Sequence, residues 1–130
     1  MSNQISFHSS TVRAYTEDDV DVIGFGDDDE SPNNYIIISR YDEPDADDLP
    51  RDEMIGIQTS ESNYEVSSAI ANIELQRNHI SILIKDENAG EVGAKQLTTD
   101  FNISDEEFTH LKKYIESLVL GSSIKFIENT

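Results

Sequence analysis

The chain has 130 residues, a length typical of one folded domain, and it carries 27 acidic against nine basic side chains, a net charge of −18. The absence of cysteine excludes disulfides, thiolate metal sites and cysteine nucleophiles. The mean hydropathy is −0.50, and the longest apolar run, Tyr35 to Ile38, is far shorter than the roughly 20 residues that a membrane-spanning helix needs. We therefore expect one soluble domain over residues 1–130, and we place it in the cytoplasm because residues 1–10 lack the features of a secretion signal.

The first part of the chain has the pattern of β-strands, because apolar and polar side chains alternate in several short stretches. The stretch Tyr35 to Ile38 is apolar at every position and rich in β-branched residues, which predicts a central strand covered on both faces. Another short strand is expected around Met54 to Ile57. The alternating N-terminal stretches are residues 5–7, 12–15 and 20–25.

A hairpin is the clearest prediction for the second half of the chain. Apolar residues alternate with polar ones over 71–75 and again over 80–84, and Arg77-Asn78 between them suits a tight turn because asparagine tolerates positive φ. A further strand is expected over Gln96 to Phe101. The apolar residues within 124–127 predict a last edge strand or a cover for the core.

One helix is well marked near the C-terminus. Ser104 is a favourable N-cap, Glu107 completes a capping box, and Gly121 suits the position just after the helix. Such a helix is marginal alone, so its apolar stripe must dock on a sheet face. The sequence therefore predicts an α+β fold, an antiparallel sheet with one principal C-terminal amphipathic helix. The stripe consists of Phe108, Leu111, Ile115, Leu118 and Val119.

The acidic side chains are concentrated in the first half, where residues 1–65 hold 17 of the 27. They form runs within residues 17–21, 27–30 and 42–48. The electrostatic field of a chain with this much negative charge repels phosphate backbones and anionic lipids. We therefore expect no direct binding to nucleic acid or membranes. The same field attracts a basic partner and speeds their encounter. The simpler interpretation is that the acidic loops only keep the chain in solution.

The sequence carries no motif for catalysis or for a dedicated metal site. Neither acidic loop has the mid-loop glycine and terminal glutamate of an EF-hand, and His8, His79 and His110 are isolated rather than arranged as a triad. Gly24-x-Gly26 is followed by four acidic residues, which excludes a phosphate-binding loop. We therefore expect a binding protein that is not an enzyme and needs neither cofactor nor metal.

A set of segments, taken in their order along the chain, carries a likeness to a known family. The set covers about residues 5–121. It resembles the immunity protein 10 family of bacterial polymorphic toxin systems. The resemblance implies a protein that binds a cognate toxin domain and neutralises it, which protects the producing cell. The segments are Val22 to Asp29, Tyr35 to Arg40, Asp42 to Asp45, Ile73 to Ile82 and Phe101 to Phe108.

Neutralisation is then expected to occur by stoichiometric occlusion of the toxin's active site or substrate channel through the acidic surface. If the toxin is a nuclease, an acidic loop would compete with substrate phosphates for its basic surface. Tyrosines join the acids among the candidate contact residues, because aromatic side chains supply much of the binding energy of interfaces. The candidate residues are Asp27, Asp28, Asp29, Glu30, Tyr35, Tyr41, Asp42, Glu43, Asp45, Asp47, Asp48 and Tyr64.

Two alternatives to a toxin-neutralising role stay open from the sequence. The chain could act as an acidic adaptor, or as a nucleic-acid-mimicking inhibitor of a basic enzyme, outside any toxin system. It could also be an α+β domain whose charge serves only to keep it soluble. A specific basic partner would separate the binding roles from the last alternative.

Overall fold

The computed structural model describes residues 4–41, 51–62 and 64–129, and of Arg51 the backbone only. These residues form strands, two 3-10 helices and two α-helices. The strands are β1 (Gln4–Ser9), β2 (Thr11–Glu17), β3 (Val20–Gly26), β4 (Tyr35–Tyr41), β5 (Ile55–Thr59), β6 (Val66–Ser67), β7 (Ile70–Gln76), β8 (His79–Ile84), β9 (Gln96–Phe101) and β10 (Lys125–Asn129). The helices are η1 (Arg51–Met54), η2 (Asp86–Asn88), α1 (Ala89–Val92) and α2 (Asp105–Val119).

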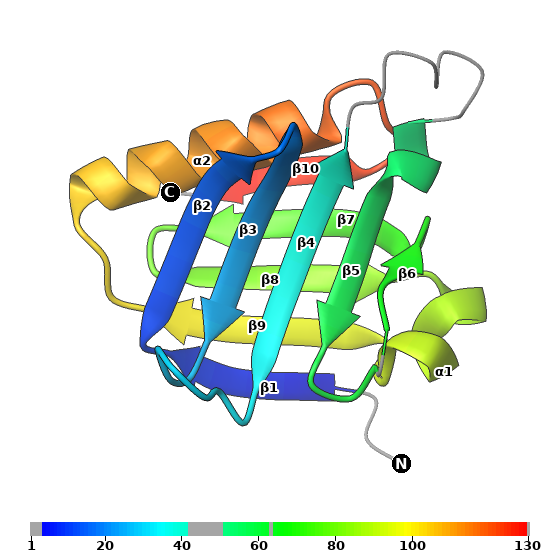
Figure 1. Ribbon diagram of the computed structural model, residues 1–130, viewed down its shortest axis with the longest axis horizontal. Helices are drawn as coiled ribbons and strands as arrows, with labels where there is room; N and C mark the ends of the chain where they lie inside the picture. Colours follow the sequence, from blue (N-terminus) through cyan, green and yellow to red (C-terminus); the bar gives the residue numbers. More distant parts are fainter. Residues whose placement is uncertain (1–3, 42–50, 63, 130) are drawn as a thin grey trace.

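The strands form two five-stranded sheets that pack face to face. Sheet A has the order β1-β9-β8-β7-β10, and sheet B has the order β2-β3-β4-β5-β6. In Figure 1 sheet B lies in front, and its strands cross those of sheet A steeply, as in sandwiches of the orthogonal type. Sheet B thus has one face toward sheet A and the other toward the viewer.

The α+β class is confirmed, but the prediction of one antiparallel sheet is wrong. There are two sheets, and sheet A is mixed because β1 pairs with β9 in parallel and β10 pairs with β7 in parallel. Alternation along a strand shows that the strand has a buried face, yet it does not show which strand lies beside it. The parallel pairs join segments far apart in the chain, which no local pattern could reveal.

The principal C-terminal helix has the predicted start. The Ser104 hydroxyl accepts a hydrogen bond from the Glu107 backbone, the Glu107 carboxylate accepts one from the Ser104 backbone, and both are 3.1 Å long. Gly121, with φ of +81°, follows the helix end. Rather than covering the face of a single sheet, α2 lies along one side of the sandwich, where it contacts β2, β3 and β10.

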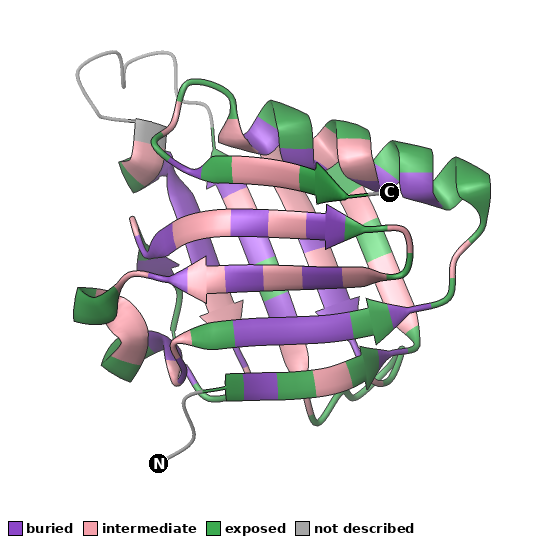
Figure 2. Ribbon diagram, turned by 180° about the vertical axis from the view of Figure 1, so that it is seen from behind, coloured by how far each residue is buried: buried purple, intermediate pink, exposed green. Residues whose placement is uncertain are grey.

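The hairpin of β7 and β8 is confirmed, with an irregularity near its start. The pairing shifts register between Ile70 and Asn72, so Ile70 is buried where simple alternation would bury Ala71. Seen from behind in Figure 2, β7 and β8 alternate between buried residues and intermediate ones. The edge strand expected near the C-terminus is present as β10.

The core lies between the two sheets and is built mainly from isoleucine. Both sheets contribute, and the aromatic rings of Phe25 from β3 and Phe101 from β9 stack with centroids 6.0 Å apart. The largest fully buried side chains are Phe25, Ile23, Ile36, Ile38, Ile55, Ile57, Ile73, Leu75, Ile80, Ile82, Ile84 and Leu97.

The expectation that β4 is covered on both faces is wrong. Ile36 and Ile38 are fully buried at 0% exposure, whereas Ile37 between them is 37% exposed. β4 is central in sheet B, but sheet A covers only its inner face. A run of β-branched residues therefore marks the strand correctly and overstates its burial.

Candidate functional site

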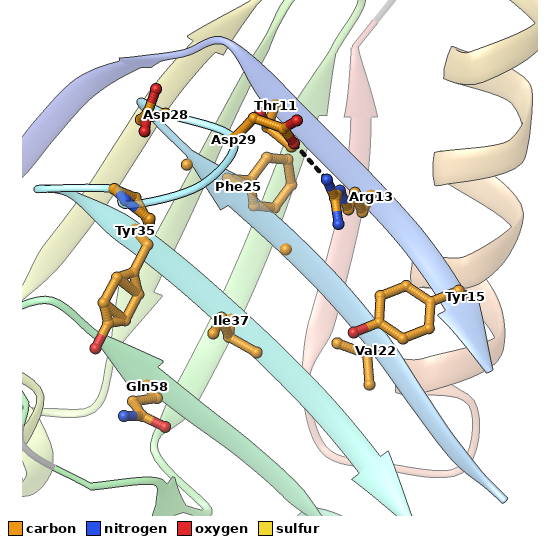
Figure 3. Close-up of a pocket in the computed structure, with 13 residues that line it drawn as sticks. Thr11, Arg13, Tyr15, Val22, Phe25, Asp28, Asp29, Tyr35, Ile37 and Gln58 are labelled. Carbon is orange, nitrogen blue, oxygen red and sulfur yellow. Dashed lines mark hydrogen bonds and ion pairs between the residues drawn. The ribbon is translucent and has the colours of Figure 1, made fainter. Parts of the chain in front are cut away.

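The outer face of sheet B carries a groove of about 340 Å³. Side chains of four neighbouring strands and of the turn between β3 and β4 form its walls (Figure 3). The lining residues are Thr11, Arg13, Tyr15, Val22, Gly24, Phe25, Gly26, Asp28, Asp29, Pro32, Tyr35, Ile37 and Gln58.

Strand register brings this set together. Gly24 of β3 pairs with Arg13 of β2 on one side and with Ile37 of β4 on the other, and Ile37 pairs with Gln58 of β5. Because directly paired residues point to the same face, these four residues form one row across the outer face of the sheet. The neighbouring rows contribute the tyrosines.

Gly24 leaves the middle of this row hollow. A β-carbon added at Gly24 would meet no atom within 4 Å, so the space above the glycine is empty. Glycine is unfavourable inside a strand, and such a position often marks close approach of a ligand or another chain. The hollow lies between Arg13 and Ile37 in this row.

The acidic turn between β3 and β4 borders one end of the groove, and Asp27 shapes that turn. The Asp27 carboxylate accepts hydrogen bonds from the side chain of Asn34 at 3.0 Å and from the backbone N–H groups of Asn33 and Asn34 at 2.9 and 3.1 Å. The side-chain bond, together with the backbone bonds, lowers the pKa of Asp27 below its ordinary value. Asp27 is therefore a structural residue of the turn.

The next two acids of the turn are among the lining residues of the groove. Asp28 accepts a hydrogen bond from the backbone N–H of Ser31 at 2.9 Å. Asp29 forms an ion pair with Arg13 across the groove (Figure 3). Both partners of this pair are largely exposed, at 59% for Arg13 and 67% for Asp29.

The structure brings together part of the predicted contact set. Asp28, Asp29 and Tyr35 line the groove, and Glu30 is exposed beside them in the same turn. Tyr41 lies farther along β4 on the same outward-facing side and is 37% exposed.

Other predicted residues do not join the groove. The Tyr64 hydroxyl donates a hydrogen bond to Glu91 of α1 at 3.1 Å, and Tyr64 is not a lining residue. This bond raises the pKa of Tyr64 above its ordinary value. Asp42, Glu43, Asp45, Asp47 and Asp48 lie outside the described residues.

Several residues of the groove are not among the residues predicted from the sequence, including Arg13, Tyr15, Val22, Gly24 and Ile37. A signal for two of them was available, because Arg13 and Tyr15 alternate with the core-facing Val12 and Ala14. The exposure of Ile37 could not be predicted, because every residue of the run in which it lies is apolar. The role of Gly24 depends on what lies above it, which only the folded sheet shows.

A second hollow of about 430 Å³ lies between β2 and α2. Its polar groups already serve the fold. The His110 ring donates a hydrogen bond of 2.7 Å to the carbonyl oxygen of Ala14, and Glu107 belongs to the capping box of α2. We therefore regard the groove on sheet B as the candidate site.

The described part of the chain shows no alternative chemistry at this site. Within residues 4–41, 51–62 and 64–129, no group of three or more histidine, aspartate or glutamate side chains is placed to hold a metal ion. None of the helices in these segments has the length and hydropathy that a membrane-spanning helix requires.

Comparison with known proteins adds no assignment. No model of a known protein family matches this sequence, and no curated protein matches it. The resemblance to immunity protein 10 therefore depends on the ordered segments given above.

Proposed function

We propose that this chain is an immunity protein that binds a cognate toxin domain with a basic surface and neutralises it in the cytoplasm of the producing cell. The observation that carries the proposal is the uncovered face of sheet B. Among the described residues, three of the five exposed large hydrophobic side chains, Tyr15, Ile37 and Tyr41, lie on this face. Contiguous exposed apolar surface with a polar rim is typical of protein interfaces.

Acidic turns lie at both ends of this face and supply charged groups at its rim. Asp28, Asp29 and Glu30 occupy the turn after β3, while Asp18 and Asp19 form the turn between β2 and β3 at the opposite end of these strands. With a net charge of −18 in the whole chain, these ends would attract a basic partner and orient it over the tyrosines.

Two of the five segments that carry the family resemblance lie at the same face. Val22 to Asp29 comprises most of β3 and the start of the acidic turn, and Tyr35 to Arg40 comprises most of β4. These segments supply the floor, one wall and the acidic end of the groove. The resemblance and the surface chemistry thus point to the same part of the molecule.

Inhibition through this face requires that the chain bind the toxin domain, and it requires no catalysis by the chain. A folded body seated on a toxin excludes the substrate for as long as the complex lasts. For a nuclease toxin, the carboxylates of the acidic turns would occupy the basic surface that otherwise holds substrate phosphates. The expected stoichiometry is one chain for each toxin domain.

The decisive experiment is a rescue assay with the toxin domain encoded beside this gene. Co-expression of this chain is expected to restore growth, and a folded variant with Tyr15→Ala and Ile37→Ser is expected to restore it poorly. The control, Leu120→Ser, removes an exposed apolar side chain just after α2 and should rescue like the natural chain. Failure of the natural chain to rescue would refute the proposal, and binding without rescue would favour the adaptor role.

A further inference from the structure

We propose that the groove on sheet B receives an arginine side chain that projects from the partner protein. Its guanidinium would pair with Asp29, and its stem would lie in the hollow above Gly24 beside Tyr15 and Tyr35. The inference rests on the proposed function only in taking the partner to be a protein with a basic surface. It adds the chemical group that this surface presents to the groove.

The chain already places a guanidinium at the acidic end of the groove. Arg13 reaches from β2 to the carboxylate of Asp29 across the groove (Figure 3). Exposed ion pairs of this kind contribute little to stability, because water and salt screen both charges. The pair can therefore open at low cost, and an arginine from a partner can take the place of Arg13 at Asp29.

The packing of neighbouring residues does not require a glycine at position 24. A β-carbon added there would meet no atom within 4 Å, although glycine is unfavourable inside a strand. The hollow lies between Arg13 and Ile37 in the same row of the sheet. A partner side chain that enters the hollow would have Asp29 at one end and apolar lining residues along its length.

Arginine fits this combination better than lysine or an apolar residue. A guanidinium is planar, stacks on aromatic rings and donates in a fork that matches carboxylates. Lysine offers a compact and strongly hydrated charge, and an apolar residue would leave the Asp29 carboxylate unused. The lining of the groove supplies both the aromatic and the carboxylate partners.

The test uses a small probe and does not require the toxin. The peptide acetyl-Gly-Arg-Gly-amide is titrated into the ¹⁵N-labelled full chain, and the chemical shifts of the backbone amides are followed. We expect saturable shifts at Gly24, Asp29 and Tyr35, with a dissociation constant on the order of 1 mM, near the weak end of specific binding. The same peptide with citrulline, a neutral isostere of arginine, should bind at least about 10-fold more weakly.

Substitutions in the groove make the test specific. Gly24→Val should fill the hollow, preserve the fold and weaken arginine binding about 10-fold or more, since it removes the space for the stem. Gly90→Ala is the matched control, because a β-carbon at Gly90 also meets no atom within 4 Å but lies in α1. Unchanged binding to the Gly24→Val variant would overturn the proposal.

Substitutions of Arg13 and Asp29 should change the affinity for the arginine peptide in opposite directions. Asp29→Asn should weaken binding about 10-fold, while Asp86→Asn, which removes an exposed acid paired with Lys95, should leave it unchanged. Arg13→Met keeps the aliphatic stem and removes the internal competitor, so binding should strengthen about threefold or more. Equal or weaker binding to Arg13→Met would overturn the exchange at Asp29.

The outcomes separate this inference from the proposed function. Arginine binding in the groove without rescue in the cell would refute the immunity role and retain the site. Rescue in the cell with peptide shifts that map to other acidic residues, or with equal binding of the citrulline peptide, would retain the immunity role and overturn the arginine site.

Discussion

The guanidinium of Arg40 lies inside the molecule at the C-terminal end of α2. It is 8% exposed and donates hydrogen bonds to the carbonyl oxygens of Ser117, Leu118 and Leu120 at 2.6, 3.0 and 3.4 Å. The last carbonyl groups of a helix lack partners within the helix, and this end attracts positive charge. A single side chain of β4 thus fixes the helix to the strand whose outer face forms part of the groove.

We predict that Arg40→Met lowers the free energy of unfolding by about 2–4 kcal/mol, because the carbonyl groups lose a charged donor in a buried place. Urea unfolding measures the change. Arg40→Lys should recover only part of it, since the lysine ammonium lies one bond closer to the backbone than the arginine Nη1 that donates all three hydrogen bonds. Lys113→Met, on the exposed side of α2, is the control, and an equal loss in both methionine variants would contradict the prediction.

Asp52 links η1 to the loop before β10. Its carboxylate accepts a hydrogen bond from the Ser123 backbone N–H at 2.8 Å and another from the Ser123 hydroxyl, and Lys85 lies 3.8 Å away. Partial burial disfavours the charged carboxylate, but the hydrogen bonds and Lys85 outweigh it, so the pKa of Asp52 lies below its ordinary value.

A lowered pKa in the folded state gives a stabilising contribution that is present above the unfolded pKa, about 3.9. The contribution is lost as the pH falls through the lower pKa of the folded state. We predict that Asp52→Asn is less stable than the natural chain at pH 7 and that this difference shrinks as the pH falls below about 4. Denaturant unfolding across this pH range would contradict the prediction if the difference stayed constant.

At the scale of elements, the sequence predicts best what neighbouring residues decide. The cap at Ser104, the stripe of α2 and the turn at Arg77-Asn78 all depend on residues a few positions apart, and the structure confirms them. The outer face of β4 is exposed because sheet A covers only the inner face, and no other element of the described structure covers the outer one. Local patterning cannot show that difference, so the apolar run predicts a cover on both faces of β4, whereas Ile37 is exposed.

The cap of α2 gives a prediction at this scale. Ser104→Ala removes the acceptor for the Glu107 backbone N–H, and we expect the protein to lose about 1 kcal/mol of unfolding free energy. Ser117→Ala, at an exposed position within α2, should leave stability unchanged or slightly raised. Thermal and urea unfolding of both variants test this, and equal effects would show that the cap contributes nothing.

At the scale of the whole molecule, the charge of the chain was evident from composition, while its arrangement required the fold. The sequence predicts Asp28, Asp29 and Tyr35 among the contact residues, and all three line the groove. Arg13 and Tyr15 come from the adjacent strand, so their place beside the acidic turn follows from sheet pairing. Composition therefore gives the charge of the chain, whereas the place of the groove follows from sheet pairing.

We predict that the double variant Asp28→Lys and Asp29→Lys slows association with the toxin domain about 10-fold at low salt, and less at about 0.5 M salt, where charges are screened. Asp27 is left in place because it holds the turn. Stopped-flow association rates measure the effect. Asp86→Lys with Glu87→Lys changes the net charge equally on exposed residues of η2, and an equal slowing by both variants would remove the turn from the interface.

The parallel pairing of β1 with β9 affects how the chain can fold during its synthesis. His8 pairs with Asp100, 92 positions later, so at translation rates of ~5–20 residues per second β1 waits roughly 5–20 s for its neighbour. The strands of sheet B pair only with their neighbours in the chain, so this sheet can assemble while the nascent polypeptide is still attached to the ribosome. The face proposed to bind a partner would then form before sheet A is complete.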